Sequence, residues 1–471
     1  MTDDLCSLSL VEAAAAIQSK QVSSEEMTQD CLGRAEALQP VINCFISLEG
    51  EDALVAARAA DQDLARGTVR GPLHGVPLAH KDLLYRAGKV MTGGSKILAD
   101  FVPDTTATVL ERLSAAGAIN LGTLNMAEFA LGASGRNEHF GPCRNPWNPD
   151  HISGGSSSGS GAAVAGGIAF GAIGTDTGGS IRLPATICGV VGMKPTQTRV
   201  SRHGVMPLSY SLDNAGPLTR TVADCARMLE VIAGADPNDP TSSQEPVPPY
   251  ESLLEGASAS DVRIGVPVNH YYDVATGAVK AALAESLEVY RGLGAEIVEI
   301  TVPGPTELRD LLGVVLRGEA ANIHAEWLTS RRDDYAEEVR TRIEAGLYLP
   351  AVRYLEAMRL RPVLLREFLD TVYDKVDVLH LPGLAIAVPT IAETDAAASG
   401  NALELNERLG WCTRAASYLG LPSLAVPCGF ADGGLPVGFQ LMGRPYAEDR
   451  LLSLGHAYQR ETAWHTMAPV I

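Results

Sequence analysis

The chain has 471 residues, of which 46% are hydrophobic and 20% charged, and its formal net charge is −19 at pH 7. This composition is typical of a folded globular protein and excludes a disordered one. The acidic balance argues against direct binding of nucleic acid or of an anionic membrane surface, because both are negatively charged. Length alone suggests two or three domains.

The N-terminal sequence carries acidic residues where a signal peptide has basic ones, and no apolar run long enough to cross a bilayer follows it. The eight cysteines form no CxxC pair and no cluster with histidine at zinc spacing. Most stand among apolar residues, which predicts buried and unreactive thiols. These features favour a reduced, cytoplasmic setting. Nothing in the sequence excludes a homo-oligomer.

Helical and strand patterns alternate along most of the chain. The expected helices cover 7–20, 23–38, 51–66, 106–117, 158–169, 220–233, 276–293, most of 307–373, and a closing stretch from about 447. The expected strands cover 75–82, 118–122, 171–175, 262–267, 295–300, 376–381, 423–427 and 436–442. Such alternation predicts the α/β class, with helices on the faces of a sheet. The proline-rich segment 234–252 interrupts the alternation, and we interpret it as a surface excursion, because strand patterns resume after it.

Two glycine–serine clusters flank an apolar segment. The first, GGSSSGSG, begins at Gly154, and the second, DTGGS, ends at Ser180. A flexible linker would not need the apolar segment between them. A nucleophile elbow centred on Ser157 would need a hydrophobic strand before it, but the preceding RNPWNPDHIS is rich in proline and asparagine. An aspartic protease needs two DTG loops, and the chain has only the one that contains Asp176.

A catalytic site with two serines fits this segment better. A helix of about 11 residues after the first cluster rises ~17 Å, and a strand of five or six residues running back covers ~18 Å. Ser156 and Ser180 can therefore finish side by side. The glycines before Ser180 leave backbone N–H groups unobstructed, as an oxyanion hole requires, although they would equally suit an ordinary tight turn.

A serine nucleophile needs a base, and no histidine stands near either cluster in the sequence. We predict that Lys81, at the end of the apolar strand GVPLAHKD, is this base. Holding a lysine neutral at pH 7 costs ~4.6 kcal/mol, which burial can supply. If the strand extends to Asp82, alternation points that carboxylate to the other face, where it would not hold the lysine charged. A solvated surface lysine is the ordinary alternative.

Several segments together resemble the amidase signature family, in the order that the family has them. They are GPLHGVPLAHKD (71–82), GPCRNPWNPDHISGGSSSGSGAAVAGG (141–167), GTDTGGSIRLPATICGVVGMKPT (174–196), LGLPSLAVPCGF and LPVGFQLMG. The resemblance extends over nearly the whole chain. It implies a large mixed β-sheet covered on both faces by helices.

The same resemblance implies one domain over 1–471, in place of the several that length suggests. Within this domain it places N-terminal helices at 1–68, a signature core at about 70–235 and a helical insertion at about 305–375 that contributes to the substrate pocket.

The resemblance also implies the roles of individual residues. Lys81 is the base, Ser156 is the bridging serine that follows a cis peptide bond, and Ser180 is the nucleophile that forms an acyl-enzyme. The implied oxyanion hole consists of the backbone N–H groups of Thr177, Gly178, Gly179 and Ser180. Supporting hydrogen bonds fall to Ser157, Asp176 and Arg182. The implied chemistry requires no metal and no organic cofactor.

Our first interpretation is an amidase that hydrolyses the C–N bond of a small-molecule amide. The alternative is the glutamine-hydrolysing subunit of a tRNA-dependent amidotransferase, which passes ammonia to a partner. Segment 405–423 does not show the acidic residue expected there to bind the amino group of glutamine. Carbamate, urea-type and nylon-oligomer hydrolases share the same triad, whereas a non-catalytic binding protein would not need all three triad residues.

Two segments outside the signature are expected to wall the pocket, namely 348–362 and 380–391. Their Leu, Tyr and Met would suit an apolar or aryl acyl group. The same residues could equally belong to the ordinary hydrophobic core.

Overall fold

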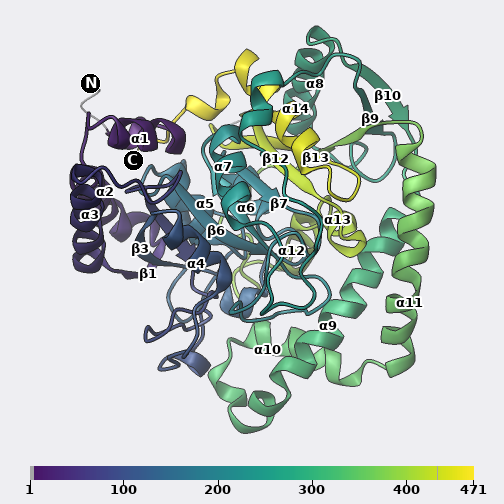
Figure 1. Ribbon diagram of the computed structural model, residues 1–471. Coiled ribbons are helices and arrows are strands. Elements are labelled where there is room, and N and C mark those ends of the chain that lie inside the picture. The colour runs from purple at the N-terminus through teal and green to yellow at the C-terminus, as the bar shows by residue number, and fades with distance from the viewer. Residues whose placement is uncertain (1–4, 432, 471) are drawn as a thin grey trace.

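A single mixed sheet of eleven strands organises the part of the chain that the computed structural model describes, residues 5–431 and 433–470 (Figure 1). Residues 1–4, which the sequence analysis places in the N-terminal helical segment, lie outside the described residues. The strand order is β1-β3-β2-β6-β8-β7-β12-β13-β11-β9-β10. The neighbours β3–β2–β6 and β11–β9–β10 run parallel, and the other neighbours run antiparallel.

The strands of this sheet are short, and most are buried along their whole length. Their bounds are β1 (Phe45–Leu48), β2 (Pro77–Lys81), β3 (Ile119–Leu124), β6 (Gly171–Asp176), β7 (Val191–Lys194), β8 (Asn214–Thr219), β9 (Arg263–Pro267), β10 (Glu296–Ile300), β11 (Val378–Pro382), β12 (Ser423–Phe430) and β13 (Pro436–Met442). A separate hairpin pairs β4 (Arg144–Asn145) with β5 (Asn148–Ile152).

Helices cover both faces of the sheet. Their bounds are α1 (Leu10–Gln18), α2 (Ser24–Ile42), α3 (Gly50–Ala65), α4 (Thr108–Ala115), α5 (Ser158–Ala165), α6 (Arg182–Cys188), α7 (Val222–Ile232), α8 (Gly277–Gly292), α9 (Pro305–Ser330), α10 (Glu337–Glu344), α11 (Ala351–Phe368), α12 (Ala402–Leu409), α13 (Arg414–Leu419) and α14 (Glu448–Glu461). Helices α5 and α6 pack against each other on one face, and α7, α8 and α14 form the layer on the other. The predicted α/β class with a large mixed sheet is therefore confirmed.

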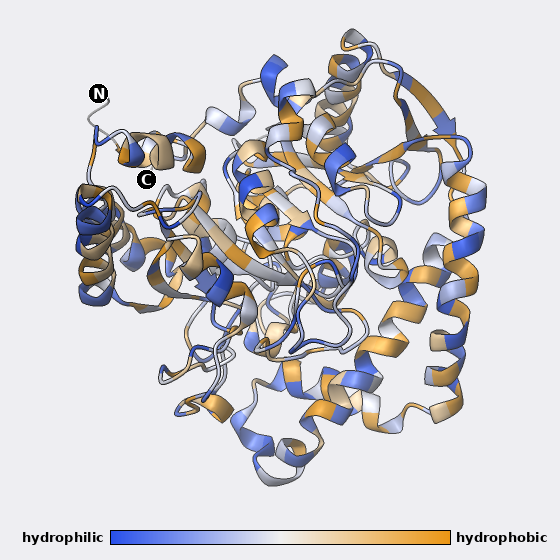
Figure 2. Cartoon of the chain, viewed as in Figure 1, coloured by the Kyte–Doolittle hydropathy of each residue, from blue (hydrophilic) through white to orange (hydrophobic). Residues whose placement is uncertain are grey.

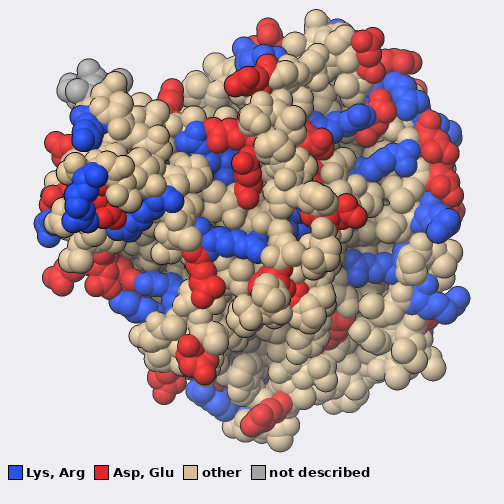
Figure 3. Space-filling view, viewed as in Figure 1, with Lys and Arg blue, Asp and Glu red and all other residues tan. Residues whose placement is uncertain are grey.

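Burial explains why this arrangement forms. Figure 2 shows hydrophobic residues along the central strands, while the outer helices alternate hydrophobic and hydrophilic residues. The central strands contribute to one large hydrophobic core, whose burial is the main driving force for folding. On the face visible in Figure 3, acidic and basic side chains are interspersed. No helix of the described residues is both long enough and apolar enough to span a membrane.

The observed elements match most of the expected ones, with corrections around the glycine-rich segments. The expected helix 158–169 ends at Ala165, because Gly166 and Gly167 follow and Gly167 adopts a left-handed φ of 66°. Strands β1, β7 and β8 are absent from the sequence-based prediction. The β8 sequence NAGPLT contains both glycine and proline, which argue against a strand in isolation. The strands before and after segment 234–252 belong to the same sheet.

Candidate active site

Lys81 is the last residue of β2, a strand that lies between β3 and β6 in the sheet. Its side chain is fully buried, and its Nζ donates hydrogen bonds to Ser156 Oγ at 2.7 Å and Thr175 Oγ1 at 2.8 Å. Burial lowers the pKa of Lys81 to about 7, although the negative charges of Asp213 and Asp176 oppose this effect. A large share of the amine is therefore neutral near pH 7. A neutral amine has a lone pair, so the direction of the hydrogen bond can reverse and Nζ can accept the proton of the Ser156 hydroxyl.

Asp82 does not hold the lysine charged. Its carboxylate lies with Thr92, whose backbone N–H donates to Asp82 Oδ2 at 3.0 Å and whose hydroxyl donates to the same oxygen. Burial raises the pKa of Asp82 to about 6. Because β2 ends at Lys81, the alternation argument does not apply to Asp82, but its carboxylate contacts Thr92 and not the Lys81 amine.

Ser156 lies in a tight turn before α5. The Gly155–Ser156 peptide bond is cis, as the resemblance implies. The Gly155 N–H donates to the Ala133 carbonyl at 2.7 Å, and the Ser156 carbonyl accepts from Ala127 N–H at 3.1 Å. A Cβ at Gly155 would lie 2.2 Å from the Gly132 carbonyl oxygen, so only glycine fits there. The backbone of this turn is therefore fixed from both sides.

The two serine clusters lie side by side, as the lengths of the intervening helix and strand predict. The Ser157 N–H donates to the Ser180 carbonyl at 3.3 Å. The Ser157 hydroxyl donates to the Thr175 carbonyl and accepts from the Thr175 N–H, both at 3.2 Å. Ser157 thus joins the first cluster to β6, in agreement with the supporting position expected for it. Ser180 follows β6 by four residues and is partly exposed, at the entrance to α6.

A buried ion pair holds the DTGGS loop. Arg182 Nε lies 3.0 Å from Asp176 Oδ2, and both side chains are fully buried. Asp176 Oδ1 accepts the Gly179 N–H at 2.7 Å, and Oδ2 accepts the Ile181 N–H at 3.2 Å. Burial alone would raise the pKa of Asp176, but the charge and hydrogen bonds of Arg182 outweigh it, and the pKa lies below its ordinary value. The carboxylate is therefore ionised and fixes the shape of the loop.

Arg182 also connects this loop to the last third of the chain. Its Nη1 donates to Gln440 Oε1 at 2.9 Å and to the Thr413 carbonyl at 3.0 Å, and its Nη2 donates to Ser417 Oγ at 2.8 Å. These contacts give Asp176 and Arg182 the supporting positions that the resemblance implies.

The backbone N–H groups of the loop differ from the expectation in one respect. In the described part of the chain, the N–H groups of Thr177 and Gly178 have no hydrogen-bond acceptor, and both residues line a cavity together with Ser180. The N–H of Gly179, in contrast, is used by Asp176 and is not free for an oxyanion in this conformation. The glycine pattern predicts a row of exposed N–H groups but does not reveal that a carboxylate has taken one of them.

Sequence reasoning missed two residues that support this site. Thr175 is the second hydroxyl on the Lys81 amine. Asp213, which is buried, accepts a hydrogen bond from Thr177 Oγ1 at 2.5 Å and from the backbone N–H groups of Leu208 and Ser209. Burial raises the pKa of Asp213. Thr175 directly precedes DTGGS, and this position could have indicated its role from the sequence. Asp213 comes from a distant loop, and no sequence signal connects it with the site.

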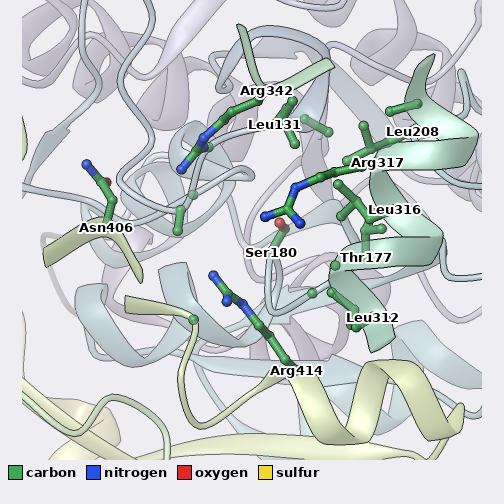
Figure 4. A pocket seen from close by; sticks show the side chains of 18 of the residues that line it. Leu131, Thr177, Ser180, Leu208, Leu312, Leu316, Arg317, Arg342, Asn406 and Arg414 are labelled. Carbon is green, nitrogen blue, oxygen red and sulfur yellow. The ribbon is translucent and has the colours of Figure 1, made fainter. Parts of the chain in front are cut away.

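The cavity at Ser180 has a volume of about 140 Å³ (Figure 4). Leu131, Leu208, Leu312 and Leu316 form its apolar wall, and Arg317, Arg342, Arg414 and Glu407 bring charge to it. No residue of 348–362 or 380–391 is among those that line it, so the expectation that these segments wall the pocket is wrong for this cavity. Leu355 is exposed instead, because α11 lies at the outside of the molecule (Figure 1), and Tyr348, three residues before that helix, is exposed too. Glu407 also lines the cavity and belongs to segment 405–423. This segment therefore does bring an acidic residue to the cavity, although the sequence analysis finds no acidic residue there for the amino group of glutamine.

The described residues contain no group of three or more His, Cys, Asp or Glu side chains that could hold a metal ion. The functional groups gathered here are an amine of low pKa, buried hydroxyls and unpaired backbone N–H groups. This set can move protons and stabilise an oxyanion, which are the tasks of acyl transfer.

Comparisons with known proteins identify the family of this chain. The family model for amidases matches residues 26–452. This chain belongs to the amidase family. It is 39% identical to a glutamyl-tRNA(Gln) amidotransferase subunit of Geobacter metallireducens over 98% of this chain and 99% of that protein.

Two solved structures place the chain in the same family. An inhibitor-bound structure of a vestigial protein complex, which reveals the origins of an s-triazine catabolic enzyme, is 34% identical with a TM-score of 0.90, over 96% of this chain and 98% of that one. The peptide amidase of Stenotrophomonas maltophilia is 32% identical with a TM-score of 0.82, over 96% of each chain. The expected enzyme class, an amide hydrolase, is thus confirmed at the level of the family.

Proposed function

We propose that this chain hydrolyses the C–N bond of a small amide through a Ser–Ser–Lys triad and an acyl-enzyme on Ser180. The observation that carries the proposal is the fully buried hydrogen bond from Lys81 Nζ to Ser156 Oγ, beside the loop that ends at Ser180. A buried amine with a pKa of about 7 can accept a proton at neutral pH, which an exposed lysine cannot do efficiently.

In the first half of the reaction, Ser180 Oγ attacks the amide carbonyl carbon while its proton passes to Ser156 and the Ser156 proton passes to Lys81. The N–H groups of Thr177 and Gly178 donate to the oxyanion of the tetrahedral intermediate. The intermediate then collapses, the C–N bond breaks, and the same relay returns a proton to the leaving nitrogen. An ester on Ser180 remains.

In the second half, water attacks the ester and gives a proton to the relay. The bond between the acyl carbon and Ser180 Oγ breaks, and the relay restores the Ser180 proton. The products are an amine or ammonia and a carboxylic acid. Asp176, Arg182 and Ser157 hold the backbone of the loop in this scheme and take no part in proton transfer.

Similarity favours the glutamine-hydrolysing alternative over a free-standing amidase as the setting of this chemistry. Relatives covered almost end to end are named as glutamyl-tRNA(Gln) amidotransferase subunits. Glu407 lines the cavity, where it pairs with Arg414 at 3.2 Å, and the presence of this acidic residue inside 405–423 weakens the sequence-based objection. In this setting the chain would work with a partner that uses the released ammonia.

The eight free, buried cysteines support a reducing, cytoplasmic compartment as part of the same proposal.

Mass spectrometry of trapped protein tests the chemistry. The chain is incubated with glutamine, an aliphatic amide, an aryl amide, an aryl ester and a carbamate, and the peptide that contains Ser180 is examined for an acyl adduct. We expect the adduct in the wild type and in Ser160→Ala, whose hydroxyl donates to the Ile173 carbonyl, but not in Ser180→Ala. An adduct that persists in Ser180→Ala contradicts the proposal.

The panel also separates the two settings. Glutamine hydrolysis that appears only when a co-purified partner is present supports the amidotransferase setting. Efficient turnover of other amides by the lone chain supports a free-standing amidase.

A further inference from the structure

Three arginines surround the candidate nucleophile. Arg317 comes from α9, Arg342 from α10, and Arg414 is the first residue of α13. All three line the cavity that contains Ser180, and Figure 4 shows their side chains extending toward the space around it. Three separate elements thus bring positive charge to one small cavity, in a chain whose formal net charge is −19.

The neighbouring carboxylates neutralise this charge only in part. Arg414 pairs with Glu407 at 3.2 Å, and Arg342 pairs with Glu338 at 3.5 Å across one helical turn. Arg317 has no ion pair or hydrogen bond from its side chain in residues 5–431 and 433–470. Glu407 is the one acidic residue among the described lining residues, so three guanidinium groups face one carboxylate there.

The arginines also repel one another. Burial lowers the pKa of Arg414, and the positive charges of Arg309 and Arg342 lower it further, in spite of the nearby Glu407. An anion bound in the cavity would relieve this repulsion. Guanidinium groups bind carboxylates through paired, parallel hydrogen bonds, which fix both the position and the orientation of the ligand.

We propose that the substrate carries a carboxylate on its acyl part and that Arg317 and Arg414 bind this carboxylate while Ser180 attacks the amide carbon. The proposal rests on the proposed function, because it takes Ser180 as the nucleophile. The substrate class is the monoamide of a small dicarboxylic acid, a class that includes glutamine. The leucines of the cavity wall then contact the methylene groups between the two ends.

Two amides of equal chain length test this inference. Succinamate and butyramide present the same carboxamide, and they differ by a carboxylate in place of a methyl group. We expect kcat/KM for ammonia release to be at least 100-fold higher with succinamate. Arg317→Gln should raise KM for succinamate at least tenfold and should lower kcat/KM much less for butyramide than for succinamate. Equal rates for the two amides, or an equal loss on both in Arg317→Gln, overturn the inference.

Arg309→Gln is the matched control. Arg309 lies on the same helix, two turns earlier, where it pairs with Asp310 at 2.8 Å and stacks on Trp411 outside the lining of the cavity. Its substitution should leave the preference for succinamate intact. A loss as large as that of Arg317→Gln would mean that general charge, rather than contact in the cavity, determines the preference, and this too overturns the inference.

Binding to Ser180→Ala separates this inference from the proposed function. Calorimetry should show that Ser180→Ala binds succinamate, and that adding Arg317→Gln weakens binding at least tenfold while adding Arg309→Gln does not. If these results hold but the wild type, alone and with any co-purified partner, hydrolyses neither these two amides nor glutamine, the proposed function fails and the carboxylate site stands. If butyramide is hydrolysed and binding shows no dependence on Arg317, the carboxylate site fails and the proposed function stands.

Discussion

Two buried lysines, at the ends of two strands of one sheet, have the same pKa but different surroundings. Lys81 ends β2 and Lys194 ends β7, both are fully buried, and burial lowers the pKa of each to about 7. Lys81 contacts two hydroxyl groups, whereas Lys194 Nζ donates to the Pro195 carbonyl at 2.8 Å. A carbonyl has no proton to give, so of these two lysines only Lys81 contacts groups from which it could accept a proton, in keeping with its proposed role as the base. A low pKa leaves a lysine neutral at pH 7, but the amine can take part in proton transfer only if its hydrogen-bond partner has a proton to give.

The largest expected effect is a difference in amide hydrolysis between variants of the two lysines. Lys81→Met should lower kcat/KM for amide hydrolysis at least about 1,000-fold, because Ser156 loses its proton acceptor. Lys194→Met should stay within a few fold of the wild type. Steady-state kinetics of both variants, with folding checked by circular dichroism, measure this difference. Comparable losses in both would mean that buried charge near Arg182, rather than a base at Lys81, controls the rate.

The pH dependence of activity sharpens the same contrast. The active form of Lys81 is neutral, so kcat/KM should fall about tenfold per pH unit below its pKa of about 7. Lys194→Met should keep this acid limb in place, as a pH–rate profile from pH 5 to 9 would show. An acid limb that disappears in Lys194→Met would assign the titration to the wrong lysine.

The two lysines should contribute equally to the pH dependence of the free energy of unfolding. Each has a pKa of about 7 when folded and an ordinary value of 10.5. Between these values the unfolded state binds more protons, so each lysine's contribution to the free energy of unfolding increases with pH, by roughly 1 kcal/mol per pH unit. Urea unfolding between pH 7 and 10 should show a shallower increase in both methionine variants. An unchanged slope in either one would mean that this lysine is not neutral in the fold.

The smallest effect concerns the second hydroxyl on Lys81. Thr175→Val keeps the shape of the side chain but removes the partner of Nζ at 2.8 Å. We expect kcat to fall about three- to tenfold and the free energy of unfolding to fall by about 1 kcal/mol, the typical worth of one hydrogen bond. A kcat equal to that of the wild type would restrict the functional contact of the amine to Ser156.

The sequence predicts those features of the candidate site that depend on residues close together in the chain. The spacing of the serine clusters, the glycines before Ser180 and the apolar strand ending at Lys81 are readable without a structure, because turn geometry and strand burial depend on neighbouring residues. The strand β8 escapes prediction, because NAGPLT forms a strand only through pairing with β6 and β7. The pocket wall escapes it as well: Arg317 and Arg414 are almost a hundred residues apart, and only tertiary packing brings them to one cavity.

The contacts of Arg182 have a consequence for how the protein is made. Its partners Thr413, Ser417 and Gln440 emerge from the ribosome more than 200 residues after Ser180. During synthesis, Arg182 therefore cannot form all of its hydrogen bonds, and so cannot fully anchor the DTGGS loop, until most of the remaining chain has been made. A chain cut short before residue 413 would carry every residue of the proposed triad and still lack the contacts of Arg182 that hold the loop ending at Ser180, so we expect such a chain to be inactive.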